Sequence, residues 1–556
     1  MRSTKKLRAT LVVVAALGSP SLATADPPAA AAEQRADGST APDLDQLEAT
    51  GAVIGSVSIM NGSIFDLENP EEDNFLYRFA NKTHITTRPE VIEQQLLFEP
   101  GETFSVQRLQ ESERILRENR YIQAARITAI PQDDGEVDIE VATRDTWTLL
   151  PKFSFSHSGG ESNSRVGLKE GNLLGSGISL EALYESDVDR DTQVLKILDS
   201  HIGDSWYGIQ AIYENSSDGY THDFQIGKPF YSLDSTRANG FSYYDNDRVD
   251  SLYDHGEIGA QYRQQSNVQE VLYGWSNGLQ NGWARRFTTG FALDEHRFSA
   301  VPDGDYPLTV LPGDRKLAYP FFAIELVQDK YEKVRNQDQI ARVEDRFTGT
   351  AFNFRIGLAS AGFGSDRDAL LLDAGAHTSF FRSRSSSLDF ATRFSGRQEA
   401  TGLKNAALDV DLRYYKRHSE KRLWYAALTG TLGHELDLDQ VPYLGGDNGL
   451  RGYPLRYQSG EKLALFTLEQ RFFTDWYPFR LFPVGAAIFF DAGRVWGDSP
   501  LGIANDGLLR DVGVGLRLGN PRSGHGNVVH IDVAYPLDGP SDLSNLQFIV
   551  EAKQSF

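Results

Sequence analysis

Two stretches near the carboxyl-terminal end of the chain contain charged residues that suit a buried ion pair. The first reads LGGDNGLRGYPLR (residues 444–456) and has Arg451 near its centre, among glycines and turn-forming residues. The second reads AAIFFDAGRVW (residues 486–496), an apolar segment that carries Asp491. A guanidinium forms two parallel hydrogen bonds with a carboxylate, so these residue types predict a charge-assisted contact between two distant segments.

The composition narrows the classes of protein that carry such a pair. The chain has 556 residues with 51 Gly, 32 Phe and 23 Tyr but only 2 Met, a balance that favours many short strands over helices. It has 55 basic and 77 acidic residues, a net charge of −22, which argues against binding to nucleic acid. Because cysteine is absent, disulfide frameworks, zinc ribbons and thiol nucleophiles are excluded.

The amino-terminal residues have the pattern of an export signal. Four basic residues precede the apolar run 11–17, and an Ala-Thr-Ala site follows at 23–25. We therefore expect residues 1–25 to be a cleaved signal peptide and residues 26–48, rich in Ala, Pro, Gly and acids, to be a disordered leader. No later stretch approaches the ~18 apolar residues that a spanning helix needs.

Residues 49–147 have a mixed pattern of strands and helices. Short strands are expected near 53–59, 125–130 and 137–143, and helices begin after residues 87 and 105. The predicted order is β-α-α-β-β, which corresponds to one small α+β domain.

Residues 148–556 lose the helical pattern and alternate between apolar and polar residues in sixteen to twenty segments separated by turn residues. Phe548, Val550 and Phe556 share one predicted apolar face of the segment 547–556. Three tryptophans with aromatic neighbours near strand ends suggest an aromatic girdle: Trp147, Trp424 and Trp496. So many strands are stable as a closed sheet, so the expected fold is a closed antiparallel outer-membrane β-barrel of about 16 strands or slightly more.

The predicted barrel determines whether the charged residues of these two segments face the lumen or the lipid. Alternation places Asp491 and Glu469 on the interior face, because a carboxylate facing lipid would cost several kcal/mol. Counting strands back from the carboxyl-terminal end makes the loop with Arg451 extracellular, and its length lets it fold back into the lumen. We expect Arg451 to meet both carboxylates there, and removal of one partner to cost about 3 kcal/mol if the site is fully buried.

The motif Leu450-Arg451-Gly452-Tyr453, followed by Phe489, Asp491 and Gly493, resembles the paired signature of the BamA/TamA superfamily of outer-membrane assembly proteins, with Leu450 in place of the usual valine. The turn 170–175 and the aromatic residue Phe556 are similar to other features of that family. The β-α-α-β-β region, with LFEPG at 97–101 between its helices, looks like a POTRA domain. The resemblance implies a latch that holds the loop in the lumen, made of Arg451, Gly452, Tyr453, Asp491, Glu469 and Gly493.

The same resemblance implies how such a protein works. A POTRA domain in the periplasm would capture an extended client protein by adding it as a strand, and a weak seam between the first and last barrel strands would template insertion. The implied partners are outer-membrane lipid, client outer-membrane or secreted proteins and a periplasmic or inner-membrane partner, with no nucleic acid, cofactor, metal or enzymatic activity. A single POTRA domain indicates a short paralogue. The seam residues would be Phe153, Phe155, Phe548, Val550 and Phe556.

Three other functions compete with this hypothesis. A passive pore would need neither the POTRA-like domain nor a filled lumen. A two-partner-secretion transporter would normally have two POTRA domains and a plug helix. An enzyme barrel would need Ser, His and Asp side chains together near the outer rim, and the sequence does not reveal such a cluster. The acidic run 187–191 has calcium-like spacing, but Thr192 and Leu198 replace the Gly and Glu of an EF-hand loop, so a polar hairpin tip is the better interpretation.

Overall fold

The computed structural model describes residues 43–556 except 71, 159–160, 302–305, 307–309, 342, 384, 523–527, 540–542, 544–545 and 554–555. The predicted signal peptide and residues 26–42 of the predicted leader lie outside the described part of the chain. The end of that leader differs from the prediction of disorder, because α1 (Leu44–Ala49) is a helix capped by the Asp43 carboxylate. Leu44 and Leu47 pack against the core of the following domain, which gives the short helix a reason to form.

The first domain contains the predicted β-α-α-β-β elements and one additional helix. Its three-stranded sheet has the order β1-β3-β2, with β1 parallel and β2 antiparallel to β3. Two helices contribute Ile92, Leu109 and Leu116 to the core beneath the sheet. A further helix between β1 and α3 was not predicted. The elements are β1 (Val53–Gly62), α2 (Phe75–Thr83), α3 (Pro89–Glu93), α4 (Val106–Glu118), β2 (Ile122–Pro131) and β3 (Glu136–Asp145).

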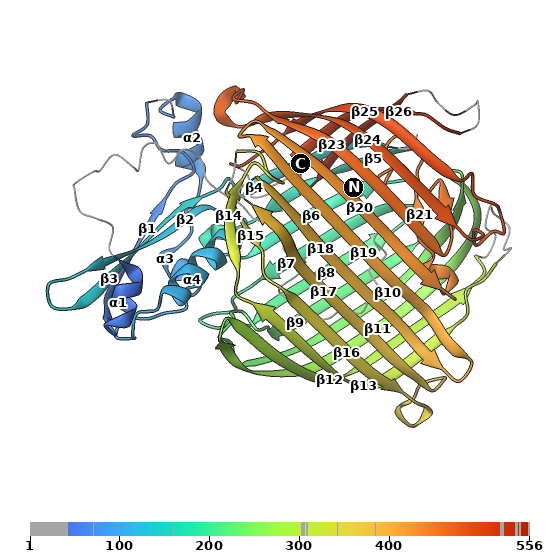
Figure 1. Cartoon of the computed structure of the whole chain (residues 1–556), viewed down its shortest axis with the longest axis horizontal. Helices are drawn as coiled ribbons and strands as arrows, with labels where there is room; N and C mark the ends of the chain where they lie inside the picture. Colours follow the sequence, from blue (N-terminus) through green and yellow to red (C-terminus); the bar gives the residue numbers. More distant parts are fainter. Residues whose placement is uncertain are drawn as a thin grey trace.

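The rest of the chain forms a closed antiparallel barrel, and the small domain lies at one of its ends (Figure 1). Over the described residues the barrel has twenty strands, the upper end of the expected range, and β27 lies beside β4 to close it. The strands are β4 (Leu149–Ser158), β5 (Glu161–Glu170), β6 (Ser179–Ser186), β7 (Asp191–Asp199), β8 (Gly208–Ser216), β9 (Gly219–Lys228), β10 (Arg237–Asp254), β11 (Glu257–Gln280), β12 (Trp283–Ser299), β13 (Arg315–Gln328), β16 (Ala351–Ala359), β17 (Ala369–Ser383), β18 (Ser386–Glu399), β19 (Gly402–Ser419), β20 (Arg422–His434), β23 (Lys462–Phe473), β24 (Val484–Trp496), β25 (Leu508–Leu518), β26 (Val528–Pro536) and β27 (Gln547–Lys553).

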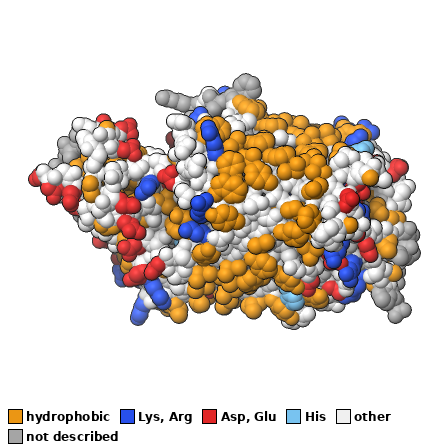
Figure 2. All heavy atoms as spheres, turned by 90° about the horizontal axis from the view of Figure 1, so that it is seen from below, with side chains coloured by type: hydrophobic (Ala, Val, Ile, Leu, Met, Phe, Trp, Pro, Cys, Tyr) orange, Lys and Arg blue, Asp and Glu red, His pale blue; other side chains and the backbone are white. Residues whose placement is uncertain are grey.

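Apolar side chains form a broad belt on the outside of the barrel, and charged side chains gather toward its ends (Figure 2). The strands alternate as predicted: on β24, Ile488 is exposed while its neighbours Ala487 and Phe489 are buried on the interior face. Trp424 and Trp496 are exposed, in keeping with a girdle, but Trp147 packs against the α2 region and does not belong to it. Among the described residues, no helix is long and apolar enough to cross a membrane.

Phe556 does not lie on the outward face predicted for it. Phe548 is exposed, whereas Phe556 is buried inside the barrel against Phe473 and near the guanidinium of Arg471. Strict alternation cannot be extended to residue 556, because the described strand β27 ends at Lys553.

Two segments depart from the barrel wall. At the end occupied by the small domain, the connection from β13 to β16 forms a hairpin of β14 (Tyr331–Arg335) and β15 (Val343–Phe347), here called the periplasmic hairpin (residues 329–350). At the opposite end, loop 435–461 joins β20 to β23 and contains the two-residue strands β21 (Tyr443–Leu444) and β22 (Gln458–Ser459). Both segments place buried charged residues inside the barrel.

Candidate functional site in the barrel lumen

The structure brings Arg451 of loop 435–461 to both predicted carboxylates. Its Nε and Nη2 donate to Asp491 at 2.7 and 3.0 Å, and its Nη1 donates to Glu469 at 2.9 Å. The guanidinium carbon lies 3.4 Å from the centroid of the Phe489 ring, and Asp491 is fully buried. The loop is thus held to β23 and β24 by a bidentate ion pair, a second carboxylate and a cation–π contact.

The neighbours of Arg451 in the loop motif also contact the wall. The Gly452 N–H donates to the Asp511 carboxylate at 3.0 Å, and a side chain at Gly452 would collide with that aspartate. The Tyr453 hydroxyl lies 2.9 Å from the backbone carbonyls of Arg510 on β25 and of Asp538 just after β26. A Cβ on Gly493 would lie 2.8 Å from Leu444, so the glycine gives the loop room to approach β24.

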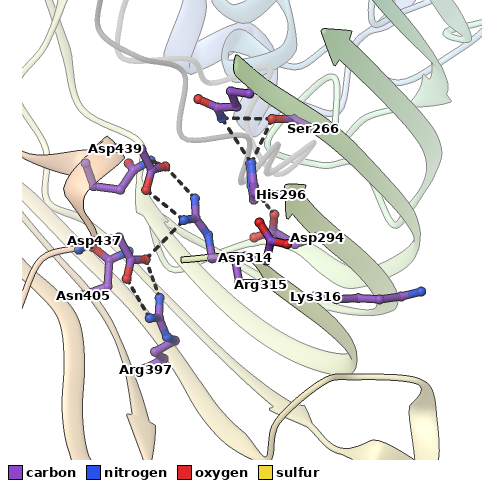
Figure 3. Close-up of polar contacts among 12 residues, drawn as sticks. Ser266, Asp294, His296, Asp314, Arg315, Lys316, Arg397, Asn405, Asp437 and Asp439 are labelled. Carbon is purple, nitrogen blue, oxygen red and sulfur yellow. Dashed lines mark hydrogen bonds and ion pairs between the residues drawn. The ribbon is translucent and has the colours of Figure 1, made fainter. Parts of the chain in front are cut away.

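Further ion pairs between arginines and aspartates hold the same loop, and the sequence did not reveal them. Each pairs a loop residue with a distant part of the wall, so neither spacing nor alternation connects the partners. Arg315 donates to Asp439 at 2.8 and 2.7 Å, and Arg397 donates to a second loop aspartate (Figure 3). Arg456 makes a bidentate pair with Asp189, at 3.0 and 2.7 Å. The acidic run 187–191 therefore serves, at Asp189, as an anchor for the loop.

A cavity of about 140 Å³ lies beside the loop and is lined by Arg315, Arg397 and the neighbouring polar side chains Ser266, Asp294 and His296, which Figure 3 labels. Ser266 Oγ lies 2.9 Å from His296 Nδ1, and His296 Nε2 lies 2.6 Å from Asp294. This is the Ser, His and Asp cluster that the sequence did not reveal. The strand pairing explains it, because Ser266 is opposite His296 in the register of β11 and β12, and Asp294 is two residues from His296.

The tip of the periplasmic hairpin enters the lumen from the other end. Asp338 accepts from the Tyr415 hydroxyl at 3.1 Å and from Arg471 Nη1 at 3.3 Å, and its backbone carbonyl accepts from the Phe556 N–H. Ile340 is buried in an apolar cluster that also contains Tyr415 and Phe556. Within the hairpin, Glu344 accepts from successive backbone N–H groups of the tip and fixes its turn.

The base of the hairpin is bound to helix α4 of the small domain. Arg117 donates to Asp345 at 2.6 and 2.8 Å, and Lys333 donates to Glu113 at 2.7 Å. Burial opposes ionisation of Glu113, but Arg117 and Lys333 together hold the pKa of its carboxyl below the ordinary value. The small domain, the hairpin and the barrel wall are therefore joined by ionised groups.

Ion pairs also connect the hairpin tip to the extracellular loop. Arg471 on β23 contacts Asp338 of the tip through Nη1 and donates from Nε to Glu469 at 2.9 Å. The other oxygen of Glu469 accepts from Arg451 of the loop. The chain of contacts Asp338–Arg471–Glu469–Arg451 therefore runs from one inserted segment to the other, with Glu469 shared between them.

The predicted seam residues lie on β4 and β27 or close to them. Phe153 is 79% exposed and Phe548 is 57% exposed, whereas Val550 is half-buried. Phe556 is turned inward, and the side chain of Phe155 lies outside the described residues. Two of these aromatic side chains thus project from the outer surface where the first and last barrel strands meet.

Comparisons with known proteins identify a family model that matches part of the barrel, and solved structures to which the chain is similar. The model of the Omp85 superfamily domain matches residues 322–555. Among solved structures, the chain is similar to BamA from Haemophilus ducreyi lacking POTRA domains 1–3 (12% identity, TM-score 0.39, covering 90% of this chain and 84% of that chain). It is also similar to CdiB from Acinetobacter baumannii (12%, 0.47, 90% and 73%) and CdiB from Escherichia coli (12%, 0.36, 93% and 91%). No curated protein matches the chain.

Proteins of the Omp85 superfamily act in transport and assembly and not in catalysis. In this chain Ser266, Asp294 and His296 lie outside the matched residues and form part of the polar lining of the cavity. Residues 322–555 of the β-barrel thus match the domain of the Omp85 superfamily, whose proteins reside in the bacterial outer membrane with POTRA domains in the periplasm.

Proposed function

We propose that this protein inserts client proteins into the outer membrane, and that clients leave through the seam between β27 and β4 instead of through the lumen. The observation that carries the proposal is the occupied lumen. Loop 435–461 is bound across it by Arg451 and by the pair Arg456–Asp189, and the periplasmic hairpin is bound beneath it by Arg471. A passive pore needs an open lumen, whereas two inserted segments held by buried ion pairs occupy this one.

The edge of the POTRA-like sheet supports client capture by strand addition. On β2, the Ile127 N–H donates to Glu113 and the Ala125 carbonyl accepts from Arg117. These backbone groups are the ones an added strand would use, and side chains of α4 occupy them. The same two side chains hold the periplasmic hairpin through Asp345 and Lys333. An arriving client strand would therefore compete for the groups that keep the hairpin in place.

The dimensions of the last strand support exit at the seam. Within the part of the chain that the structure describes, β27 has 7 residues, whereas its neighbour β26 has 9 and β4 has 10. A short strand offers fewer backbone hydrogen bonds to its partner, so this junction is the least costly place for a client strand to enter the sheet.

Crosslinking during client assembly tests the proposal. The chain has no native cysteine, so one introduced residue reports on one position. Phe548→Cys places a photo-crosslinker at the seam, and Thr429→Cys places it on a barrel strand that pairs with neither β27 nor β4. We expect a newly made outer-membrane barrel protein to crosslink at position 548 and not at 429. Crosslinks inside the lumen would instead indicate a two-partner-secretion type of transporter.

A variant at the edge of β2 tests capture separately. Ile127→Pro removes the N–H that an added strand needs, and proline is tolerated on edge strands. We expect loss of client crosslinks at position 548, while Ile127→Val retains them. Normal client assembly in Ile127→Pro, or in a variant lacking residues 51–146, would contradict the proposal and, together with steady conductance, would favour the pore.

A further inference from the structure

Helix α2 of the POTRA-like domain has an exposed apolar surface that strand capture does not use. Phe75, Leu76 and Phe79 are 84%, 56% and 55% exposed. The opposite side of the helix is packed: Tyr77 is buried against Phe65 with stacked rings 4.1 Å apart. The exposed side chains are therefore not needed to hold the helix on its domain, and a helix that leaves three large apolar side chains in water loses stabilisation that burial would give.

The barrel continues this apolar surface. The Tyr77 hydroxyl donates to the carbonyl of Phe479, and Arg522 forms a buried ion pair with Glu72 just before the helix. These contacts fix α2 beside the turn that joins β23 to β24. Figure 1 shows the helix next to the rim of the barrel at the end occupied by the small domain. Exposed aromatic residues of that turn extend the surface: Trp476 (64%), Phe479 (78%) and Phe482 (39%).

The position of the surface identifies its partner as lipid. The turn leads directly into β24, whose Ile488 is 55% exposed on the outer face of the barrel. The patch is thus continuous with the surface that contacts the hydrocarbon region, at the depth where aromatic side chains are enriched in membrane proteins. Of the two exposed cations of α2, Arg78 is paired with the exposed Asp73, and Lys82 lies beside the apolar residues and suits a phosphate headgroup.

We propose that α2 and the turn 474–482 form a membrane-docking surface that binds the periplasmic leaflet of the outer membrane beside the barrel. The apolar side chains would enter the boundary between headgroups and acyl chains, to a depth of about 5–10 Å. Docking would hold the POTRA-like domain against the membrane next to β24, independently of which client it captures.

Depth-dependent quenching tests the surface in the full-length protein. Phe79→Cys is labelled with an environment-sensitive fluorophore and reconstituted in vesicles of phosphatidylethanolamine and phosphatidylglycerol that contain doxyl-labelled lipid. The matched control is Asp133→Cys, an exposed position on the β2–β3 turn. We expect the probe at 79 to be quenched by the lipid label about threefold more than the probe at 133, with emission shifted to the blue.

Equal quenching at the two positions, with both probes open to iodide in the water, would overturn the proposal, because the surface would then await a protein partner or a second copy. Phe75→Cys is the second labelled variant, and since both side chains point outward, neither label disturbs the packing of Tyr77. Heat-resistant migration on gels verifies in each case that the barrel has folded.

Discussion

At the scale of single residues, Arg451 neutralises a group of acids that would otherwise repel one another inside the barrel. Asp491 and Glu469 accept its hydrogen bonds, and Asp532 lies 3.6 Å from it. Loss of the guanidinium would leave these carboxylates buried without their shared cation, which is far more costly than loss of a surface ion pair.

Arg451→Ala should therefore weaken the barrel measurably. We expect destabilisation of about 3 kcal/mol and loss of heat-resistant migration at lower temperature, and Asp491→Ala should have a similar effect. Arg451→Lys should recover only part of the loss because an ammonium group cannot form the bidentate pair. The control is Arg297→Ala, since Arg297 lies at the exposed end of β12. If Arg451→Ala migrates like this control, loop 435–461 is not held by the pair.

Glu344 in the periplasmic hairpin should make the hairpin sensitive to pH. Burial, with the neighbouring Asp338 carboxylate, raises the pKa of Glu344 to about 8 from an ordinary value of 4.5. The folded hairpin thus favours the protonated form of Glu344. The stability that this group contributes is present at low pH and is lost as pH rises from about 4.5 to about 8.

A spin label at Arg335→Cys, an exposed hairpin position, should become more mobile between pH 5 and pH 8.5. Glu344→Gln should remove that change, because an amide keeps one acceptor oxygen for the tip and does not ionise in this range. A pH response that survives in Glu344→Gln would assign the titration to another group.

The sequence was sufficient to place Arg451, Asp491 and Glu469 together, because alternation fixes which strand face looks inward and the loop motif resembles a known pair. It was insufficient for Arg471 and Asp338. Arg471 follows Glu469 by two residues and so shares its face, but its partner lies 133 residues away in a segment with no predicted position in the lumen.

At the scale of elements, the periplasmic hairpin has two attachments of different kinds. Its base is bound to α4 by two ion pairs, one made by the buried Arg117 and one by the exposed Lys333, and its tip is bound by the buried residues Ile340 and Asp338. Movement of the small domain would act on the base first, because α4 and the hairpin share the pair Arg117–Asp345.

Asp345→Ala should loosen the hairpin without unfolding the barrel. In an Ile340→Cys background, we expect maleimide to modify the tip about tenfold faster when Asp345 is replaced, which corresponds to about 1.4 kcal/mol in the opening equilibrium. Asp133→Ala in the same background is the control. An unchanged labelling rate would show that the base does not govern the position of the tip.

The hairpin and α2 could not be predicted from composition. Residues 329–350 are charged and alternate weakly, as an ordinary connection on the surface does, and only their contacts with β19 and β23 give them a place inside the barrel. Helix α2 depends on packing against Trp147 and Phe65 rather than on its own propensity, since 9 residues make a marginal helix in water. The barrel itself was predictable because its two-residue period repeats over the greater part of the chain.

At the scale of the whole molecule, the two inserted segments obstruct the same path at its two ends. Obstructions in series must both be removed before ions pass freely. They are also coupled, because Glu469 contacts the arginines of both attachments.

Single-channel recording should distinguish series obstruction from a passive pore. We expect the protein to be nearly closed in planar bilayers, and Asp345→Ala alone, or Arg451→Ala with Arg456→Ala, to give only brief openings. The combination of all three changes should give sustained conductance greater than the sum of the two sets. Steady conductance of the unmodified protein would contradict the proposed role of the inserted segments.

The binding site of the hairpin tip has a consequence for the order in which the protein is assembled. Tyr415, Arg471 and Phe556, which receive the tip, are all made after it during synthesis. The binding site for the tip is therefore incomplete until the later strands have joined the barrel wall. A barrel whose assembly stalls before that point has no hairpin tip blocking its periplasmic end. Seating of residues 336–341 is thus a late maturation event that marks the finished molecule from a partly built one.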